Sequence, residues 1–160
     1  MKVSNQFSLK QLVIHLLVVC SLAMLHASCT WNPTEKELNE SDLEFIRSLG
    51  ILNTGEKIEL FDCNSGFKGI EQSGNFISDK RIACYWIEDG IKEIHSAFFA
   101  NEIDSMALND LSTSLTYSSS IKVYKRDKSS FEIYVDGDST RVRLFYNRAQ
   151  DNLQKYGISR

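Results

Sequence analysis

The sequence predicts a mainly β domain with flanking helices, an α+β fold. Three observations support this class: a short helical pattern that ends at a glycine, a middle section of short β-rich runs separated by turn residues, and an apolar helical face near the C-terminus. About 130 residues follow the first 28 positions, which is enough for one domain with its own core and too few for two of ordinary size.

The first predicted element is a two-turn helix at 42–49. Ser41 and Glu44 have the spacing of a capping box, in which the serine hydroxyl accepts from a backbone amide and the glutamate reaches back. Gly50 can supply the left-handed residue that ends such a helix. Four apolar residues share one side of the helix: Leu43, Phe45, Ile46 and Leu49.

The middle of the chain predicts an antiparallel meander of about seven strands. Turn residues separate the runs, for example at Gly74, Asp79 and Gly90. The β-rich runs lie at 57–63, 67–72, 75–78, 81–87 and 92–99, around 107–111, and at 120–125 and 131–135.

The last predicted element is a helix at 139–156. The apolar residues at 142, 144 and 146 also suit a strand, but a helical plot accounts for more of the pattern. Asp138 or Ser139 can cap this helix, and Gly157 can end it. Six apolar residues fall within one arc of about 100 degrees, as in a helix that packs on a core: Val142, Phe145, Tyr146, Ala149, Leu153 and Tyr156.

The first 28 residues have the pattern of a signal peptide. Lys2 and Lys10 precede an apolar run at 12–25, and small residues follow it. The run has 14 residues and is interrupted by a histidine, a cysteine and a serine, whereas crossing a bilayer takes about 20 apolar residues. We therefore expect the segment to be removed after export.

The end of this segment, Ala27-Ser28-Cys29, resembles the bacterial lipobox, with His26 where that pattern has an aliphatic residue. The resemblance implies cleavage before Cys29 and its acylation, which tethers a protein durably when several chains are attached. We expect a signal at 1–28, a tether at 29–40, a domain at 41–160, and a cell-envelope lipoprotein that faces the periplasm or the cell surface. The alternatives are ordinary cleavage near Ala27 or Ser28 and a retained membrane anchor.

Two cysteines remain in the predicted domain, Cys63 and Cys84. Export allows them to form a disulfide, which would stabilise the fold by roughly 3 kcal/mol in the chain-entropy model. They can equally be two buried free thiols. If a further strand lies between their strands, the Cα atoms are roughly 9–10 Å apart, too far for a disulfide.

Three short motifs resemble those of the bacterial pleckstrin-homology-like (PH-like) domains. They are GEKIELF at 55–61, GNFISDKRI at 74–82 and FFANEIDS at 98–105, and the resemblance covers about residues 51–156. Ser78 stands where the family motif has threonine. The resemblance implies a bent seven-stranded antiparallel sandwich or partial barrel, with the C-terminal helix capping one open end.

Phosphoinositide binding, known from eukaryotic relatives of that fold, does not follow from the resemblance. Phosphate recognition needs several converging cations, and the expected loop at 63–68 offers Lys68 alone. A shared fold does not carry an activity.

Composition and motifs give no indication of catalysis, metal binding or nucleic-acid binding. The chain has 18 basic and 21 acidic residues; removing Lys2 and Lys10 leaves 16 basic ones and a net charge of −5. His95 is the one histidine of the predicted domain and suits a structural role in a strand. DGDST at 136–140 fits a turn and a helix cap better than a calcium loop. We expect no enzyme activity and no cofactor.

One charged stripe remains, formed by Arg141, Arg148 and Lys155 at intervals of seven along the C-terminal helix. It can be a solvated face, or a docking stripe for an acidic partner or for anionic lipid headgroups.

These observations lead to two functional hypotheses. The first is a non-catalytic binding or scaffold module, attached to a membrane by lipid, with an unidentified protein partner or self-association. The alternative is a small β-barrel that binds an apolar ligand, as lipocalins do. A ligand-sized cavity would separate the two.

Overall fold

The computed structural model describes residues 38–63, 69–111, 113, 118–135 and 137–157. The predicted signal peptide at 1–28, the acylation site Cys29 and Lys68 lie outside these residues. None of the helices in the described part is long and apolar enough to cross a membrane.

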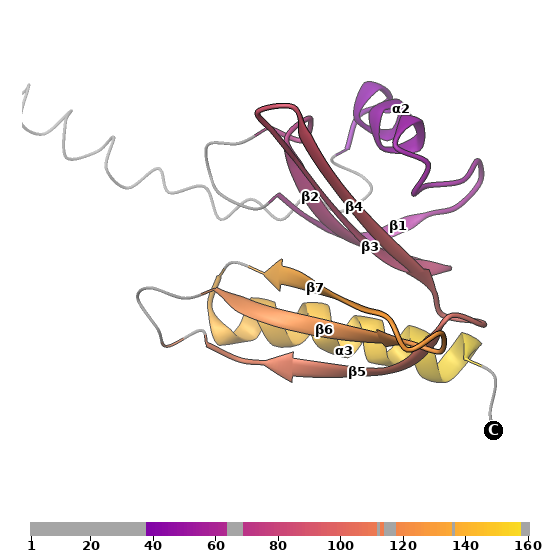
Figure 1. Cartoon of the computed structure of the whole chain (residues 1–160), viewed down its shortest axis with the longest axis vertical. Coiled ribbons are helices and arrows are strands. Elements are labelled where there is room, and N and C mark those ends of the chain that lie inside the picture. Colours follow the sequence, from indigo (N-terminus) through magenta and orange to yellow (C-terminus); the bar gives the residue numbers. More distant parts are fainter. Residues whose placement is uncertain (1–37, 64–68, 112, 114–117, 136, 158–160) are drawn as a thin grey trace, which may run out of the picture. The chain divides into compact units, whose positions relative to one another are not determined.

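The described residues form seven antiparallel strands in two sheets, with a helix before and after them (Figure 1). In chain order they are α2 (Glu40–Ser48), β1 (Ile58–Asp62), β2 (Ser73–Ser78), β3 (Arg81–Glu88), β4 (Ile91–Phe98), β5 (Ile103–Asn109), β6 (Ser119–Lys125), β7 (Ser130–Val135) and α3 (Ser139–Tyr156). The four-stranded sheet has the order β1-β2-β3-β4 and the three-stranded sheet the order β5-β6-β7. The prediction of a mainly β fold with flanking helices is confirmed.

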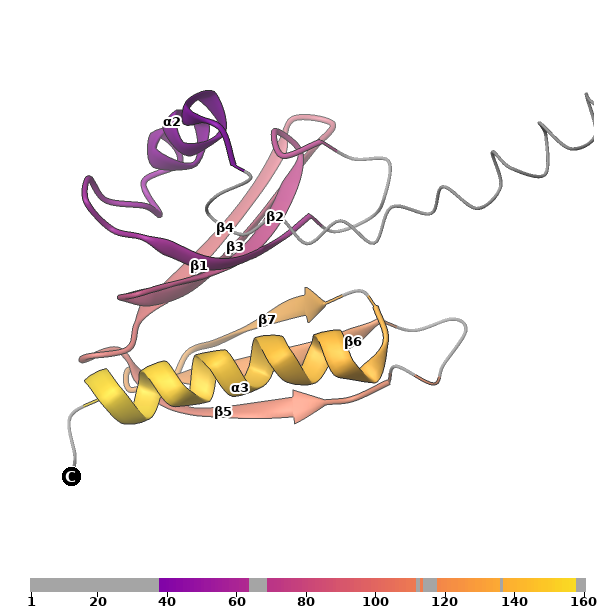
Figure 2. The ribbon, with the colours of Figure 1, turned by 180° about the vertical axis from the view of Figure 1, so that it is seen from behind.

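The four-stranded sheet is covered on both faces near its centre. All six residues of β2 and the first five of β3 are buried, whereas a strand with one solvent face alternates between buried and exposed positions. Figures 1 and 2 show α2 on one side of this sheet and the three-stranded sheet on the other. Phe76, Ala83 and Tyr85 pack in the cluster that contains Ile46 of α2.

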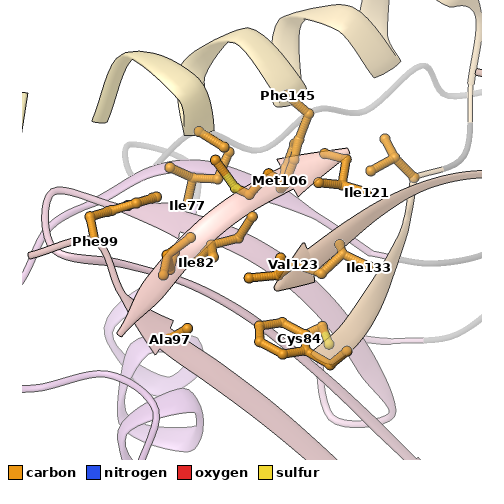
Figure 3. Close-up of a cluster of buried hydrophobic side chains, with 14 of the residues drawn as sticks. Ile77, Ile82, Cys84, Ala97, Phe99, Met106, Ile121, Val123, Ile133 and Phe145 are labelled. Carbon is orange, nitrogen blue, oxygen red and sulfur yellow. The ribbon is translucent and has the colours of Figure 1, made fainter. Parts of the chain in front are cut away.

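The main core lies between the two sheets and α3 (Figure 3). The four-stranded sheet contributes Ile77 and Ile82, and the three-stranded sheet contributes Ile121 and Ile133; all four are fully buried. In Figure 3, Phe145 points from α3 toward this cluster. Apolar burial of this kind contributes about 25 cal/mol per Å² and makes the two sheets and α3 one packed unit.

The bounds predicted for the C-terminal helix are those of α3, and its predicted apolar face is confirmed. Val142, Phe145 and Ala149 are buried, and Asp138 is the N-cap. The sequence pattern did not mark Asn152, which is 4% exposed. Its amide donates to Ser78 O at 3.0 Å and to Glu59 Oε2 at 2.8 Å, so a polar residue on this face joins α3 to β1 and β2.

The beginning of the domain differs from the prediction. The N-cap of α2 is Asn39, not Ser41: the Asn39 side chain accepts from Asp42 N, and Asp42 Oδ2 accepts from Asn39 N, both at 3.0 Å. Leu38 is buried in the α2 cluster. The folded domain therefore includes residues assigned to the 29–40 tether. Gly50 does follow the helix with φ +78°, as expected.

Two strand predictions are wrong in their limits. Within the expected run at 67–72, the described residues form a turn in which Gln72 N donates to Gly69 O at 2.9 Å. The strand expected around 107 begins earlier, because Ile103 is buried and pairs with Lys125 of β6. In β5, pairing with β6 overrides the local pattern.

Gly74 lies within β2 and not in a turn. A Cβ at this position would come within 2.6 Å of the Tyr85 hydroxyl and 2.7 Å of Cζ of Phe61. The glycine is thus required by the close approach of two aromatic rings to the backbone, and not by a special backbone angle.

A buried ion pair holds the β2–β3 turn against the segment before β1. Arg81 donates to both Glu56 oxygens at 2.9 Å, and the two side chains are 4% and 0% exposed. The Ser78 hydroxyl also donates to Glu56, and the Arg81 guanidinium lies 3.9 Å from the centroid of the Phe98 ring. Bidentate geometry and full hydrogen bonding offset the cost of removing these charges from water.

Replacing Arg81 with Met should lower the free energy of unfolding by about 3–5 kcal/mol, because it leaves the Glu56 charge buried without its partner. Urea denaturation of the purified full chain, followed by circular dichroism, measures this. Arg47→Met is the control, since the Arg47–Glu40 pair is exposed and should contribute under about 1 kcal/mol. Equal losses in the two variants would contradict the structural role of the buried pair.

Candidate ligand-binding cleft

A cleft of about 860 Å³ opens between the outer half of the β3–β4 hairpin and β7. This volume lies within the range of small-ligand and peptide sites. Its lining includes Cys84, Trp86, Glu88, Ile91, Glu93, His95, Lys122, Phe131, Glu132 and Tyr134.

The cleft lies where the side chains on the inner face of the four-stranded sheet change from buried to exposed. Cross-strand pairing places side chains of this face in rows: Ile77, Ile82 and Ala97, then Asn75, Cys84 and His95, then Ser73, Trp86 and Glu93, and finally Glu88 and Ile91. The first row is fully buried in the core, while the last is exposed. The hairpin therefore extends beyond the part of the sheet that the core covers.

The second row holds β7 in place. The Asn75 amide donates to Tyr134 O at 2.5 Å, and the Cys84 thiol donates to Glu132 O at 3.7 Å. The His95 ring stacks on Phe131, with 5.4 Å between the ring centroids and an interplanar angle of 11°. These contacts position one wall of the cleft against the other. His95 has the structural contact that the sequence analysis expected.

Beyond this row the cleft combines aromatic rings with carboxylates. Trp86 Nε1 donates to Glu88 Oε2 at 3.2 Å, and the Tyr134 hydroxyl donates to Glu132 Oε2 at 3.1 Å. Tyr134 is 50% exposed and Ile91 is 62% exposed. The cleft thus offers ring faces and an aliphatic side chain to a ligand, with acidic groups beside them.

The electrostatic character of the cleft is negative. Among the described residues, its lining has four carboxylates, Glu88, Asp89, Glu93 and Glu132, against one ammonium, Lys122, which lies 3.8 Å from Glu132. The pKa of Tyr134 is raised because its hydroxyl donates to Glu132 and because Glu132 is negatively charged. The negative charge of the cleft therefore favours the binding of a cationic ligand.

The thiol in the cleft is poorly suited to nucleophilic chemistry. Cys84 and His95 are direct cross-strand neighbours, and a cysteine nucleophile with a histidine base has such a neighbour. However, burial, followed by the negative charge of Glu93, raises the pKa of Cys84 to about 12. A reactive cysteine has a lowered pKa, because the thiolate is the nucleophile.

Cys63 and Cys84 are both free thiols. Cys63 follows β1 and Cys84 lies on β3, with β2 between these strands. This is the arrangement in which the sequence analysis expected no disulfide. Burial and the charge of Asp62 raise the pKa of Cys63 to about 11.

In the described part of the chain, no group of three or more His, Cys, Asp or Glu side chains is placed to hold a metal ion. Of the DGDST motif, Asp136 lies outside the described residues. Asp138 accepts from Arg141 N at 2.9 Å as the helix cap.

One cation of the predicted docking stripe on α3 is held by the fold. Arg141 forms an ion pair with Asp62 of β1, whose side chain is 2% exposed. Arg148 lies 3.9 Å from Glu59, and Lys155 lies 4.7 Å from the centroid of the Tyr156 ring. Arg141 therefore joins α3 to β1, whereas Arg148 and Lys155 are exposed and the docking stripe stays a prediction.

Sequence reasoning did not identify the cleft residues. Glu93 and Tyr134 lie in the runs predicted at 92–99 and 131–135, without a role of their own, although the strand pattern does place Trp86 on the same face as Cys84. The sequence-based prediction did not include the crossing of β7 over the β3–β4 hairpin, because no local pattern encodes that crossing.

Comparison with known protein families, with curated proteins and with solved structures finds no match to this chain.

Replacing Arg141 with Ala should lower the free energy of unfolding by about 1.5–3 kcal/mol, the usual contribution of a hydrogen bond between charged groups, because Asp62 is buried. Arg148→Ala removes a cation from the same face, and we expect a loss under about 1 kcal/mol, since its pair is long and exposed. Urea denaturation of both variants measures the difference. If the two losses are the same, α3 does not depend on the Asp62 pair.

Proposed function

We propose that this chain is a non-catalytic binding module of the bacterial cell envelope, attached to a membrane by lipid on Cys29, and that the cleft between the β3–β4 hairpin and β7 is its contact surface. The observation that carries the proposal is the cleft itself. It joins exposed aromatic and aliphatic side chains to charged groups at the edge of a filled core, as binding sites commonly do.

A PH-like classification of the domain forms part of this proposal. Support comes from the order of the elements, in which a four-stranded antiparallel sheet precedes a three-stranded one and a C-terminal helix. Further support comes from α3, which contributes to the core between the two sheets.

A binding role accounts for the cleft better than catalysis does. Cys84 stays protonated at neutral pH because its pKa is about 12, and His95 is stacked on Phe131. Neither group has the environment of an activated nucleophile or base.

The alternative of an apolar ligand inside a small barrel receives less support. Ile82, Ile121 and Ile133 fill the space between the sheets and are 0% exposed. The cleft lies at the edge of the sandwich, and carboxylates line it.

The lipid attachment predicts the location of the protein. In bacteria, the native chain should fractionate with membranes, and Cys29→Ala should move the folded domain to the soluble fraction, because an acyl anchor contributes roughly 0.8 kcal/mol per buried methylene. Immunoblots of membrane and soluble fractions measure this. A variant that stays uncleaved in the membrane would identify the apolar segment at 12–25 as the anchor instead.

The cleft predicts where a partner makes contact. A photo-crosslinking amino acid placed at Tyr134 should give a defined adduct in living cells. The same amino acid at Leu144 of α3 is the matched control, since both side chains are 50% exposed and Leu144 lies outside the cleft. Adducts from position 144 with none from position 134 would show that the cleft is not the contact surface.

A further inference from the structure

We propose that the cleft binds an extended, basic peptide segment that adds as a strand to the free edge of β4 and places a lysine or arginine side chain beside Glu93. This inference rests on the proposed function, because it names the kind of partner that the same cleft takes.

Strand β4 is one of the four outer strands of the two sheets. In the described part of the chain, β4 pairs with β3 alone, so a row of backbone N–H and C=O groups along its other side has no strand partner. Most of its outer half is exposed, including Ile91, Lys92, Glu93 and His95.

Each of the other three outer strands has a contact with the opposite sheet or with α3. Side chains of the opposite sheet bind two carbonyls of β7, those of Glu132 and Tyr134. The Tyr146 hydroxyl of α3 donates to Met106 O of β5 at 3.4 Å, and α3 also holds β1 through the Asp62–Arg141 pair. Strand addition is therefore favoured at β4.

The cleft adjoins this edge on one face. Ile91, Glu93 and His95 point from alternate positions of β4 to the inner face of the sheet, and all three line the cleft. A strand added to β4 would lie about 4.8 Å away, and every second side chain of that strand would enter the cleft.

Charge determines which side chains fit there. Glu93 lies directly across from Trp86 in the β3–β4 register and is exposed, so an incoming cation could pair with the carboxylate and contact the indole ring. The negative charge of Glu93 also helps to raise the pKa of Cys84. An acidic segment would instead meet four carboxylates and one ammonium.

A second copy of the chain is a poorer occupant of this edge. Antiparallel pairing of β4 with β4 would bring two acidic clefts together, with a Glu93 on each strand. Like charges in neighbouring positions across strands are destabilising. A partner of opposite charge avoids this repulsion.

The test uses the full chain in detergent solution and three synthetic peptides of eight residues, the length of β4. One alternates valine and lysine, the second alternates valine and glutamate, and the third is the lysine peptide with N-methyl groups on alternate residues. We expect the lysine peptide to bind in calorimetry and both others to bind at least about tenfold more weakly. N-methylation removes the backbone donors that strand addition needs, and the glutamate peptide has the wrong charge.

Two variants with the same change of charge complete the experiment. Glu93→Lys should weaken binding of the lysine peptide by at least about tenfold. Glu44→Lys, on the exposed side of α2, should leave it within about twofold.

Equal binding of the lysine and glutamate peptides, full binding of the N-methylated peptide, or an unchanged affinity in Glu93→Lys would each overturn the inference. So would a dimer in analytical ultracentrifugation that Glu93→Lys disrupts. If no peptide binds while position 134 still crosslinks in cells, the proposed function stands and the ligand class is wrong. If position 134 gives no adduct, the proposed function itself fails.

Discussion

The two-sided burial of β2 and β3 is the constraint on which the rest of the structure depends. A sheet covered on both faces must present apolar side chains in both directions, and adjacent residues such as Phe76 and Ile77 enter different clusters. This fixes the register of the hairpin, because a slip by one residue would exchange the two faces. Helix α2 and the three-stranded sheet can then pack on opposite sides of one rigid layer.

The cleft is a consequence of where this burial ends. The four-stranded sheet continues past the core, and its inner face changes from isoleucine and alanine to tryptophan and glutamate over a few rows. Strand β7 crosses this sheet at the row of Asn75 and Cys84. The side chains of these two residues donate hydrogen bonds to backbone carbonyls of β7. These contacts satisfy an edge that would otherwise be exposed and give the cleft a fixed wall, as a binding site requires.

Buried charges have two different roles in this molecule. The Glu56–Arg81 pair is fully enclosed and hydrogen-bonded, so it specifies the position of the chain before β1. The Asp62–Arg141 pair is partly exposed and fastens the terminal helix to an outer strand. The carboxylates of the cleft, in contrast, outnumber the cations beside them. That imbalance makes the cleft a candidate for binding a cation, while the paired charges serve the fold.

The sequence by itself determined the features that depend on local periodicity and capping. The bounds of α3, its apolar face and the succession of β-rich runs followed from side-chain spacing, because helix and strand periods act over a few residues. The tertiary structure alone decided that Arg141 serves the fold and that Trp86, Glu93 and Tyr134 meet in one cleft. Asn75 and Tyr134, whose contact sets that cleft, are 59 positions apart, and the crossing of two sheets depends on how whole faces pack, which no local pattern records.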